Sequence, residues 1–147
     1  MAPEPNFQEA FSIKGGDFIN AGAASVRIRK ILKDIGVDAE IIQRLAIAAY
    51  EAEMNVVMYA REGIMQLLIY PHKILVKVED KGQGIENIEQ AMQPGYSTAT
   101  PEMREMGFGA GMGLPNIKKN ADHFNIASTV GKGTKLEITL NLDGKNG

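Results

Sequence analysis

Residues 107–116 read Gly-Phe-Gly-Ala-Gly-Met-Gly-Leu-Pro-Asn, with glycine at four alternate positions ahead of a helix-like run. Glycine tolerates left-handed backbone angles and, having no side chain, lets several backbone N–H groups approach one ligand. At the N-terminus of a helix such a backbone suits an anion, most often a phosphate. A hinge has the same composition, so this stretch predicts a nucleotide only if the rest of the chain meets the nucleotide's other needs.

The overall composition is that of one globular domain. The chain has 147 residues, of which 44% are hydrophobic and 23% are charged, and this length is enough for a real core. We expect a single domain over residues 1–147, with residues 1–6 and 143–147 disordered. The net charge of −2 argues against a general nucleic-acid or membrane-surface binder, which is normally basic.

Residue types that are missing exclude several chemistries. The chain has no cysteine, which excludes disulfides, thiolate catalysis and cysteine-held zinc. Its only histidines are His72 and His123, too few for a histidine-rich metal site. The start of the chain lacks the features of a signal peptide, and no apolar run approaches the ~20 residues of a membrane span. We therefore expect a cytoplasmic protein with no membrane partner and no direct nucleic-acid partner.

Two helices are predicted in the first half of the chain. The first covers about 21–35, is capped by Asp17 or Asn20 and is ended by Gly36. Its predicted apolar face consists of Val26, Ile28, Ile31, Leu32 and Ile35. The second is capped by Asp38, runs to about Ala60 and is apolar most of the way round, which predicts a buried central helix.

The remaining pattern is mostly that of strands. Period-two alternation and turn residues predict strands over about 7–13, 64–70, 74–79, 124–130 and 134–142. Short helices are expected over 86–92 and 114–121, with a Gly-, Ser- and Thr-rich connection over 94–112. The sum is an α+β fold, a two-layer α/β sandwich with a mostly antiparallel sheet covered by helices on one face.

Glu51 and Asn55 interrupt the buried second helix. They are four residues apart, so both side chains project from one face of the helix. A carboxylate in apolar surroundings is costly unless it is paired or used. In the functional interpretation, Asn55 is an oxygen ligand of Mg²⁺ and Glu51 is a base. In the structural interpretation, both side chains form hydrogen bonds with the backbone of a loop. Glu53 is predicted to be a surface or salt-bridging charge.

Two further glycine-containing segments follow predicted strands. Asp80 precedes Gly82 and Gly84, where a carboxylate can accept a hydrogen bond from the amine of adenine. An ordinary turn gives the same pattern. Residues 131–134 read Gly-Lys-Gly-Thr and predict a hairpin, in which Thr134 either contacts the adenine side of a ligand through water or has no such role.

Other nucleotide motifs do not fit. No Gly-Lys stretch has the spacing of a P-loop, and the glycines at 107–113 close a long loop instead of a tight strand-to-helix turn, as a dinucleotide fingerprint requires. A protein-kinase catalytic loop of the His-Arg-Asp type is absent from the sequence.

Taken in order, the four segments around Glu51/Asn55, Asp80, Gly107–Gly113 and Thr134 resemble the boxes of the ATPase superfamily of gyrase, the large heat-shock chaperone, sensor histidine kinases and mismatch-repair ATPases. This GHKL group has the Bergerat ATP-binding fold. Within it the short chain is similar to bacterial anti-sigma-factor and switch-protein serine/threonine kinases. Gly95-Tyr96-Ser97-Thr98 and residues 109–115 are similar to the stressosome-type switch kinases of that group.

The resemblance implies ATP and Mg²⁺ as cofactors and a role for each matching residue. Glu51 would be the catalytic base, Asn55 would coordinate Mg²⁺, and Asp80 would bind the adenine amine. The other implied nucleotide contacts are Gly82 and Gly84 in the adenine pocket, Gly109, Gly111 and Gly113 at the phosphates, Arg104 at the γ-phosphate and Thr134 in support of Asp80.

The reaction implied is transfer of the ATP γ-phosphoryl group to a Ser or Thr of a small partner, expected to be an anti-sigma-factor antagonist of the STAS type. Such a kinase regulates transcription indirectly. A sigma factor or a phosphatase is the competing client. Dimers are common among the proteins it resembles, so a homodimer is open.

Three rivals share parts of this pattern. A sensor histidine kinase fragment needs a phosphoacceptor histidine on a dimerising helix pair, and neither His72 nor His123 lies on one. A gyrase-type ATPase needs a second domain to supply a lysine. An ATP-gated binding module without phosphoryl transfer remains the main alternative, although Glu51 favours an enzyme.

Overall fold

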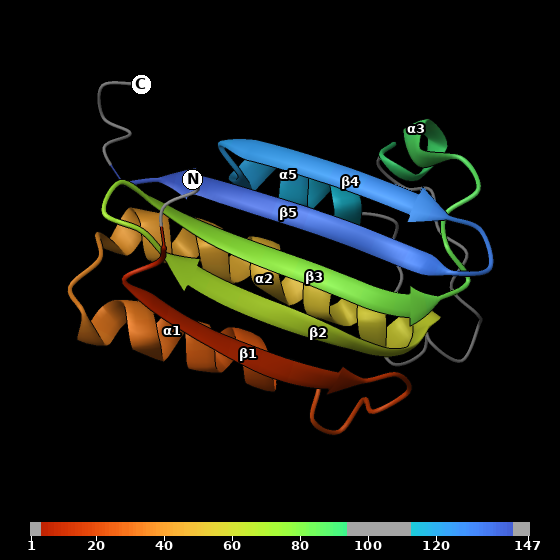
Figure 1. Ribbon diagram of the computed structural model, residues 1–147, viewed down its shortest axis with the longest axis horizontal. Coiled ribbons are helices and arrows are strands. Elements are labelled where there is room, and N and C mark those ends of the chain that lie inside the picture. Colours follow the sequence, from red (N-terminus) through yellow and green to blue (C-terminus); the bar gives the residue numbers. More distant parts are fainter. Residues whose placement is uncertain (1–3, 94–112, 143–147) are drawn as a thin grey trace.

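The computed structural model describes residues 4–93 and 113–142, and Figure 1 shows their arrangement. The elements in chain order are β1 (Phe7–Lys14), α1 (Ala23–Asp34), α2 (Ala39–Tyr59), β2 (Ala60–Ile69), β3 (Lys73–Gly82), α3 (Ile88–Ala91), α5 (Gly113–Asn120), β4 (His123–Thr129) and β5 (Gly133–Asn141). Residues 1–3 and 143–147, predicted to be disordered, and the predicted 94–112 connection lie outside the described residues.

The strands form one five-stranded sheet in the order β1-β2-β3-β5-β4, and every pairing among the described residues is antiparallel. Alternate positions point to the helices, so Met65 and Leu67 of β2 and Val76 and Val78 of β3 are buried. The predicted α+β sandwich with helices on one face is therefore confirmed. The Tyr70 N–H donates to the Lys73 carbonyl and closes the hairpin between β2 and β3.

The predicted ends of several elements differ from the observed ones. The second strand was expected from residue 64, but β2 begins at Ala60, directly after α2. The last residues of α2 and the first of β2 thus share one corner of the fold. The Asn6 N–H donates to the Ile69 carbonyl, which ties the residue before β1 to the sheet.

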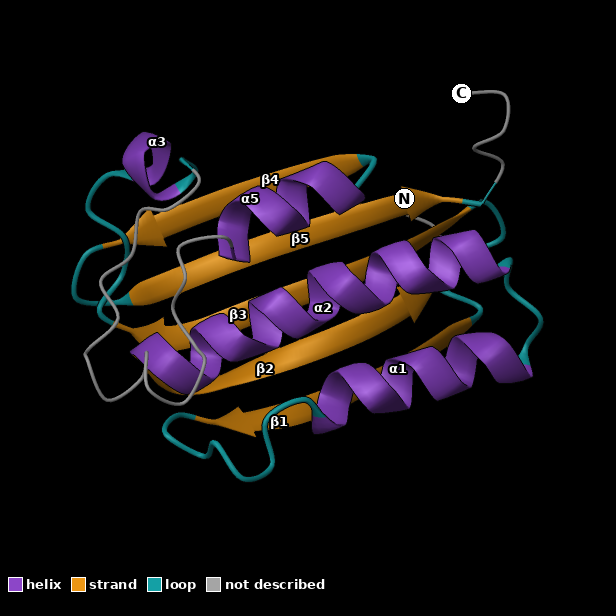
Figure 2. Cartoon of the chain, turned by 180° about the vertical axis from the view of Figure 1, so that it is seen from behind, coloured by secondary structure: helices purple, strands orange, loops and turns teal. Residues whose placement is uncertain are grey.

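Helix α2 is the centre of the helix layer, with α1 and α5 on either side of it (Figure 2). Its core positions carry small side chains, which let the neighbouring helices and the sheet approach closely. The alanines buried on this helix are Ala46, Ala48, Ala49 and Ala52. The prediction of a central buried helix is confirmed.

Glu9 is a charged residue on the otherwise apolar face of β1, and a contact with α1 explains its position. Its carboxylate accepts a 3.2 Å hydrogen bond from Arg27 Nε. The pair lies at the edge where β1 and α1 face each other, and both side chains are partly exposed. The polar residue therefore links the edge strand to the helix layer without being buried.

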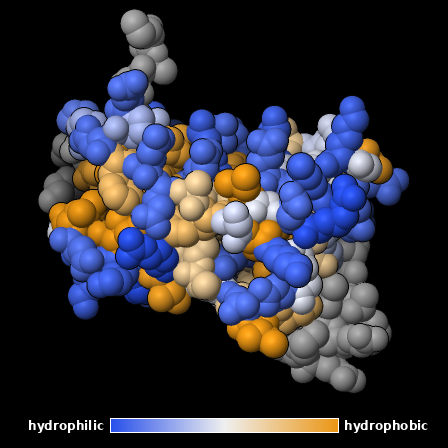
Figure 3. Space-filling view, turned by 60° about the horizontal axis from the view of Figure 1, so that its bottom comes forward, coloured by the Kyte–Doolittle hydropathy of each residue, from blue (hydrophilic) through white to orange (hydrophobic). Residues whose placement is uncertain are grey.

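Two details predicted for α1 are wrong. Val26 is 68% exposed, because α1 buries Ile28, Ile31 and Leu32 against the core and turns Val26 to solvent. Ile35, which follows the end of the helix, is 54% exposed. Figure 3 views the α1 and β1 side of the molecule, where hydrophobic surface is broken up by hydrophilic residues.

The expected cap of α1 is also different. Asp17 accepts hydrogen bonds from the backbone N–H and side-chain amide of Asn20 within the preceding turn, which hold the pKa of the Asp17 carboxyl below its usual value. Neither side chain caps the helix; its N-cap residue is Gly22, which has a left-handed backbone conformation and no side chain.

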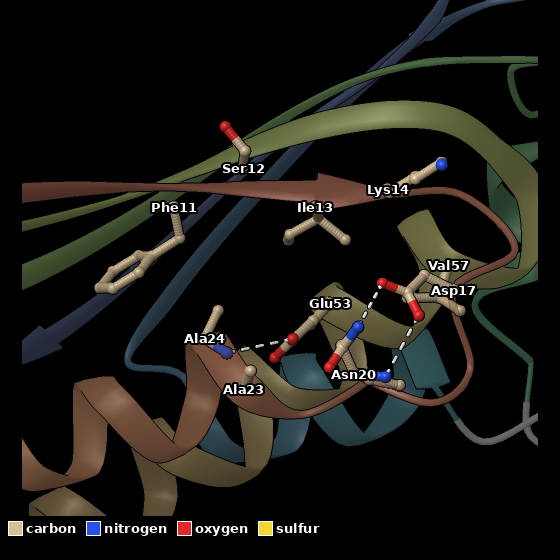
Figure 4. Close-up of a pocket in the computed structure, with 11 residues that line it drawn as sticks. Phe11, Ser12, Ile13, Lys14, Asp17, Asn20, Ala23, Ala24, Glu53 and Val57 are labelled. Carbon is tan, nitrogen blue, oxygen red and sulfur yellow. Dashed lines mark hydrogen bonds between the residues drawn. The ribbon is translucent and has the colours of Figure 1, made fainter.

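The carboxylate of Glu53 caps the start of α1 instead, so the prediction that Glu53 is a surface or salt-bridging charge is wrong. Glu53 is only 2% exposed and projects from α2 toward the start of α1, beside a cavity of about 230 Å³ (Figure 4). Its oxygens accept the backbone N–H groups of Gly22, Ala24 and Ser25 and the Ser25 hydroxyl. A negative charge at a helix N-terminus is stabilised by the unpaired N–H groups there.

Within residues 4–93 and 113–142, no helix is both long enough and apolar enough to cross a membrane.

Candidate nucleotide and phosphoryl-transfer site

Asp80 lies near the end of β3, beside the start of β5. Its Oδ1 accepts a 3.1 Å hydrogen bond from the Thr134 backbone N–H. Burial raises the pKa of the Asp80 carboxyl above its usual value, although hydrogen bonds from the Thr134 and Gly82 N–H groups lower it in part. A half-buried carboxylate with acceptor capacity left over suits an exocyclic amine of a ligand.

Glycine is required where the backbones around Asp80 come close together. Gly133 has φ +141°, and a Cβ there would overlap the Asp80 carbonyl oxygen. Gly84 has φ +79°, and a Cβ there would overlap the Thr129 carbonyl oxygen. These glycines bring the β3 end and the β4–β5 turn into direct backbone contact beside Asp80.

Ser128, on β4, was missed by the sequence reasoning. Its hydroxyl accepts a 2.7 Å hydrogen bond from the Ile85 N–H and lies 3.0 Å from the Gly133 carbonyl oxygen. It also lies 2.9 Å from the Thr134 hydroxyl. Ser128 therefore joins the segment after Gly84 to the β4–β5 turn. Thr134 supports Asp80 through its backbone, while its hydroxyl is engaged by Ser128.

Glu51 and Asn55 lie on one face of α2, at the start of α5. A Cβ added to Gly113, the first residue of α5, would lie 3.3 Å from Asn55 Oδ1 and 3.7 Å from Glu51 Oε1. The two side-chain oxygens therefore lie beside one point at the helix start, where N–H groups have no partner within the helix. An amide oxygen and a carboxylate oxygen are both ligands of a hard cation.

Two residues missed from the sequence hold α5 against α2. Asn116 Nδ2 donates a 3.0 Å hydrogen bond to Glu51 Oε2. Two turns earlier on α2, Arg44 Nε donates to the Asn120 carbonyl at 3.1 Å, and its Nη2 lies 2.9 Å from Asp122 Oδ1. In the sequence, the one signal for Asn116 was its place as a polar residue between the apolar Leu114 and Ile117, both of which are buried in the structure.

The Asp80 and Glu51 regions are joined through the corner between α2 and β2. Asn55 is one turn before Tyr59, and a Cβ at Gly82 would lie 2.9 Å from the Tyr59 carbonyl oxygen. Gly82 is also paired with Ala60 in the sheet. The end of β3 therefore lies against the end of α2, which brings the region of Asp80 next to the last turns of α2, where Asn55 lies.

An open groove of about 720 Å³ lies between the outer faces of α1 and α2, and Glu51 is one of its lining residues. No group of three or more His, Cys, Asp or Glu side chains in the described part of the chain is arranged to hold a metal. The predicted phosphate contacts Arg104, Gly109 and Gly111 lie outside the described residues.

Comparison with known proteins gives the family of the chain. The model of the histidine kinase-like ATPase domain family matches residues 19–140, which is most of the chain and includes every site residue described above. The chain therefore belongs to the histidine kinase-like ATPase domain family.

Among its relatives are regulatory proteins of similar length. The chain is 37% identical to the anti-sigma F factor of Caldanaerobacter subterraneus subsp. tengcongensis over 105 residues, which cover 68% of this chain and 70% of that protein. It is 32% identical to the serine/threonine-protein kinase RsbT of Bacillus subtilis over 113 residues, which cover 74% and 79%.

A solved structure shows the same fold. The crystal structure of the RsbU and RsbW domains of a Mycobacterium tuberculosis protein matches with a TM-score of 0.55 and 18% identity. The match covers 89% of this chain and 32% of that longer chain, so the likeness shows the fold alone.

The predicted resemblance to anti-sigma-factor and switch-protein kinases of this ATPase superfamily is confirmed by these matches. The relatives' names and the ATPase domain support the predicted regulatory kinase switch with ATP as its nucleotide. The roles assigned to the individual site residues stay predictions.

Proposed function

We propose that the chain is a Mg-ATP-dependent serine/threonine protein kinase that acts as a regulatory switch. The observation that carries the proposal is the position of Glu51 and Asn55, whose oxygens lie beside Gly113 at the start of α5. Phosphoryl transfer requires positioning, a metal that neutralises charge and a base near the acceptor hydroxyl. The kinship with RsbT, named a serine/threonine-protein kinase, supports the reaction type.

Each described residue has a distinct task in this proposal. Asp80 accepts a hydrogen bond from the adenine amine, Asn55 Oδ1 is a ligand of Mg²⁺, and Glu51 accepts the proton of the attacking hydroxyl. One protein oxygen fits Mg²⁺, which takes its other ligands from phosphates and water. The remaining phosphate contacts are assigned to Arg104, Gly109, Gly111 and Gly113.

The substrate we propose is a Ser or Thr of a small anti-sigma-factor antagonist of the STAS type. The names of the anti-sigma F relatives support a client from the sigma-factor regulatory system. A sigma factor bound without modification, or a phosphatase, is the competing partner. The accessible groove beside Glu51 leaves room for an acceptor segment of another protein to approach the base.

The experiment that tests the function is transfer of label from γ-³²P-ATP and Mg²⁺ to purified antagonist-domain proteins. We expect the wild type to label one of them on Ser or Thr. Glu51→Gln should lower the transfer rate by roughly 10²- to 10⁴-fold, the usual contribution of a general base. Glu40→Gln, in the exposed first turn of the same helix, is the matched control and should be unaffected.

The ATP-gated binding module is the alternative that one observation favours, since Asn116 already engages the Glu51 carboxylate and gives it a structural use. Tight Mg-ATP binding without label on any partner would support that module and contradict the kinase.

A further inference from the structure

The two carboxylate oxygens of Glu51 have different surroundings. Oε2 accepts the 3.0 Å hydrogen bond from Asn116 Nδ2. Oε1 is the oxygen nearest to the point that a Cβ on Gly113 would occupy, 3.7 Å away, on the side where Asn55 Oδ1 also lies. One oxygen is therefore held by α5, and the other faces the side where Asn55 lies.

The donor of this bond is fixed by packing. Leu114 and Ile117, on either side of Asn116 in the sequence, are 8% and 0% exposed and belong to the hydrophobic core. The Arg44 contact with the Asn120 carbonyl holds the far end of α5. Because α5 is anchored at both ends on α2, the Asn116 amide has little freedom to leave Glu51.

We propose that Asn116 is a positioning residue for Glu51, an inference that rests on the proposed function. Its amide fixes the carboxylate rotamer so that Oε1, and not Oε2, is presented to the acceptor hydroxyl. A hydrogen bond to a charged group is among the stronger hydrogen bonds in proteins. Holding the reacting groups in the correct geometry beforehand lowers the activation barrier of such a reaction substantially. Loss of the amide then lowers the rate of the chemical step and leaves nucleotide binding intact.

The test measures single-turnover release of label from γ-³²P-ATP and Mg²⁺, both with water as acceptor and with the antagonist-domain proteins. Asn116→Ala should lower the rate constant by roughly 10- to 100-fold, as expected for one charge-assisted hydrogen bond, with KM for ATP changed by less than about two-fold. Asn116→Asp keeps the shape of the side chain and places a carboxylate against Glu51, so its loss should be at least as large.

Asn120→Ala is the matched control. Asn120 lies one turn later on α5 and donates its side-chain amide to the Asn116 carbonyl, not to Glu51. Its rate constant should stay within about two-fold of the wild type. An equal loss in Asn120→Ala and Asn116→Ala, or a loss in Asn116→Ala that appears in KM instead of the rate constant, would overturn the inference.

A second readout needs no turnover. In ¹⁵N–¹H spectra the side-chain amide of Asn116 should shift when Glu51→Gln is introduced, and a signal that does not move would also overturn the inference. If the wild type hydrolyses ATP but labels no partner, the kinase proposal fails, while the Asn116 variants still decide this inference. If the wild type releases label no faster than buffer alone, with water and with the partner proteins as acceptor, both the kinase proposal and this inference are overturned.

Discussion

The Asp80 carboxylate and the Thr134 backbone N–H are joined by a 3.1 Å hydrogen bond across the ends of β3 and β5. The two residues are 54 positions apart in the chain, and the bond forms because Gly133 lets the two backbones touch. It holds a partly buried carboxylate in place while burial raises its pKa. Such a group is costly to the fold unless it is used in binding.

Asp80→Asn should separate nucleotide binding from folding. A carbonyl replaces the charged acceptor, so we expect the dissociation constant for ADP, measured by calorimetry, to rise by roughly ten-fold or more. Because the folded pKa of Asp80 is raised above 3.8, its contribution to stability is present below that value and is lost as pH rises through the folded pKa. The unliganded variant should therefore melt no lower than the wild type near neutral pH. Unchanged ADP affinity would contradict the assignment.

Gly133→Ala and Gly131→Ala test the close approach of the backbones in one turn. Both glycines have positive φ, but only a Cβ at Gly133 would meet other atoms, since Gly131 faces open space. Gly131→Ala should cost about 1–2 kcal/mol for the left-handed conformation, and Gly133→Ala should cost clearly more. Urea unfolding measures both. Only Gly133→Ala should weaken ADP binding, because only it displaces the Asp80 backbone; equal effects would show that the approach is unimportant.

Much of this fold is predictable from the sequence because its signals are local. Alternation of apolar residues marks the strands, and Gly36 marks the end of the first helix, which the structure confirms. The pairing of Glu51 with Asn55 follows from helix spacing alone. These features depend on residues within one or two turns of each other.

The rest depends on contacts between distant parts of the chain. Glu53 accepts N–H groups 28 to 31 positions away, and Asn116 reaches Glu51 across 65 positions. Nothing in the helical period shows which polar side of α2 meets the start of α1 or α5. Ser128 was missed for the same reason, since its partners lie on two different turns.

Glu53→Gln should show that the carboxylate is part of the core. The substitution removes the negative charge and leaves one acceptor oxygen for four donors, so we expect the free energy of unfolding to fall by about 2–4 kcal/mol. Urea denaturation provides the measurement. Glu62→Gln is the matched control: its exposed ion pair with Lys81, at 3.8 Å, should contribute less than about 1 kcal/mol. An equal loss of unfolding free energy in the two variants would mean that the Glu53 carboxylate at the start of α1 adds no stability.

Arg44 and Asp122 should make the anchor of α5 sensitive to acid. Burial tends to raise the pKa of the Asp122 carboxyl, but hydrogen bonds from the Asn141 N–H and from Arg44, with the guanidinium charge, hold it below 3.8. Its stabilising contribution is therefore present above 3.8 and is lost as pH falls through the folded pKa. We expect Asp122→Asn to lower the melting temperature near neutral pH and the difference from the wild type to shrink in strong acid. Arg44→Met should also lower the melting temperature near neutral pH, because the Asn120 carbonyl loses its donor as well. A difference that does not change with pH would show that the carboxylate charge has no part in holding α5.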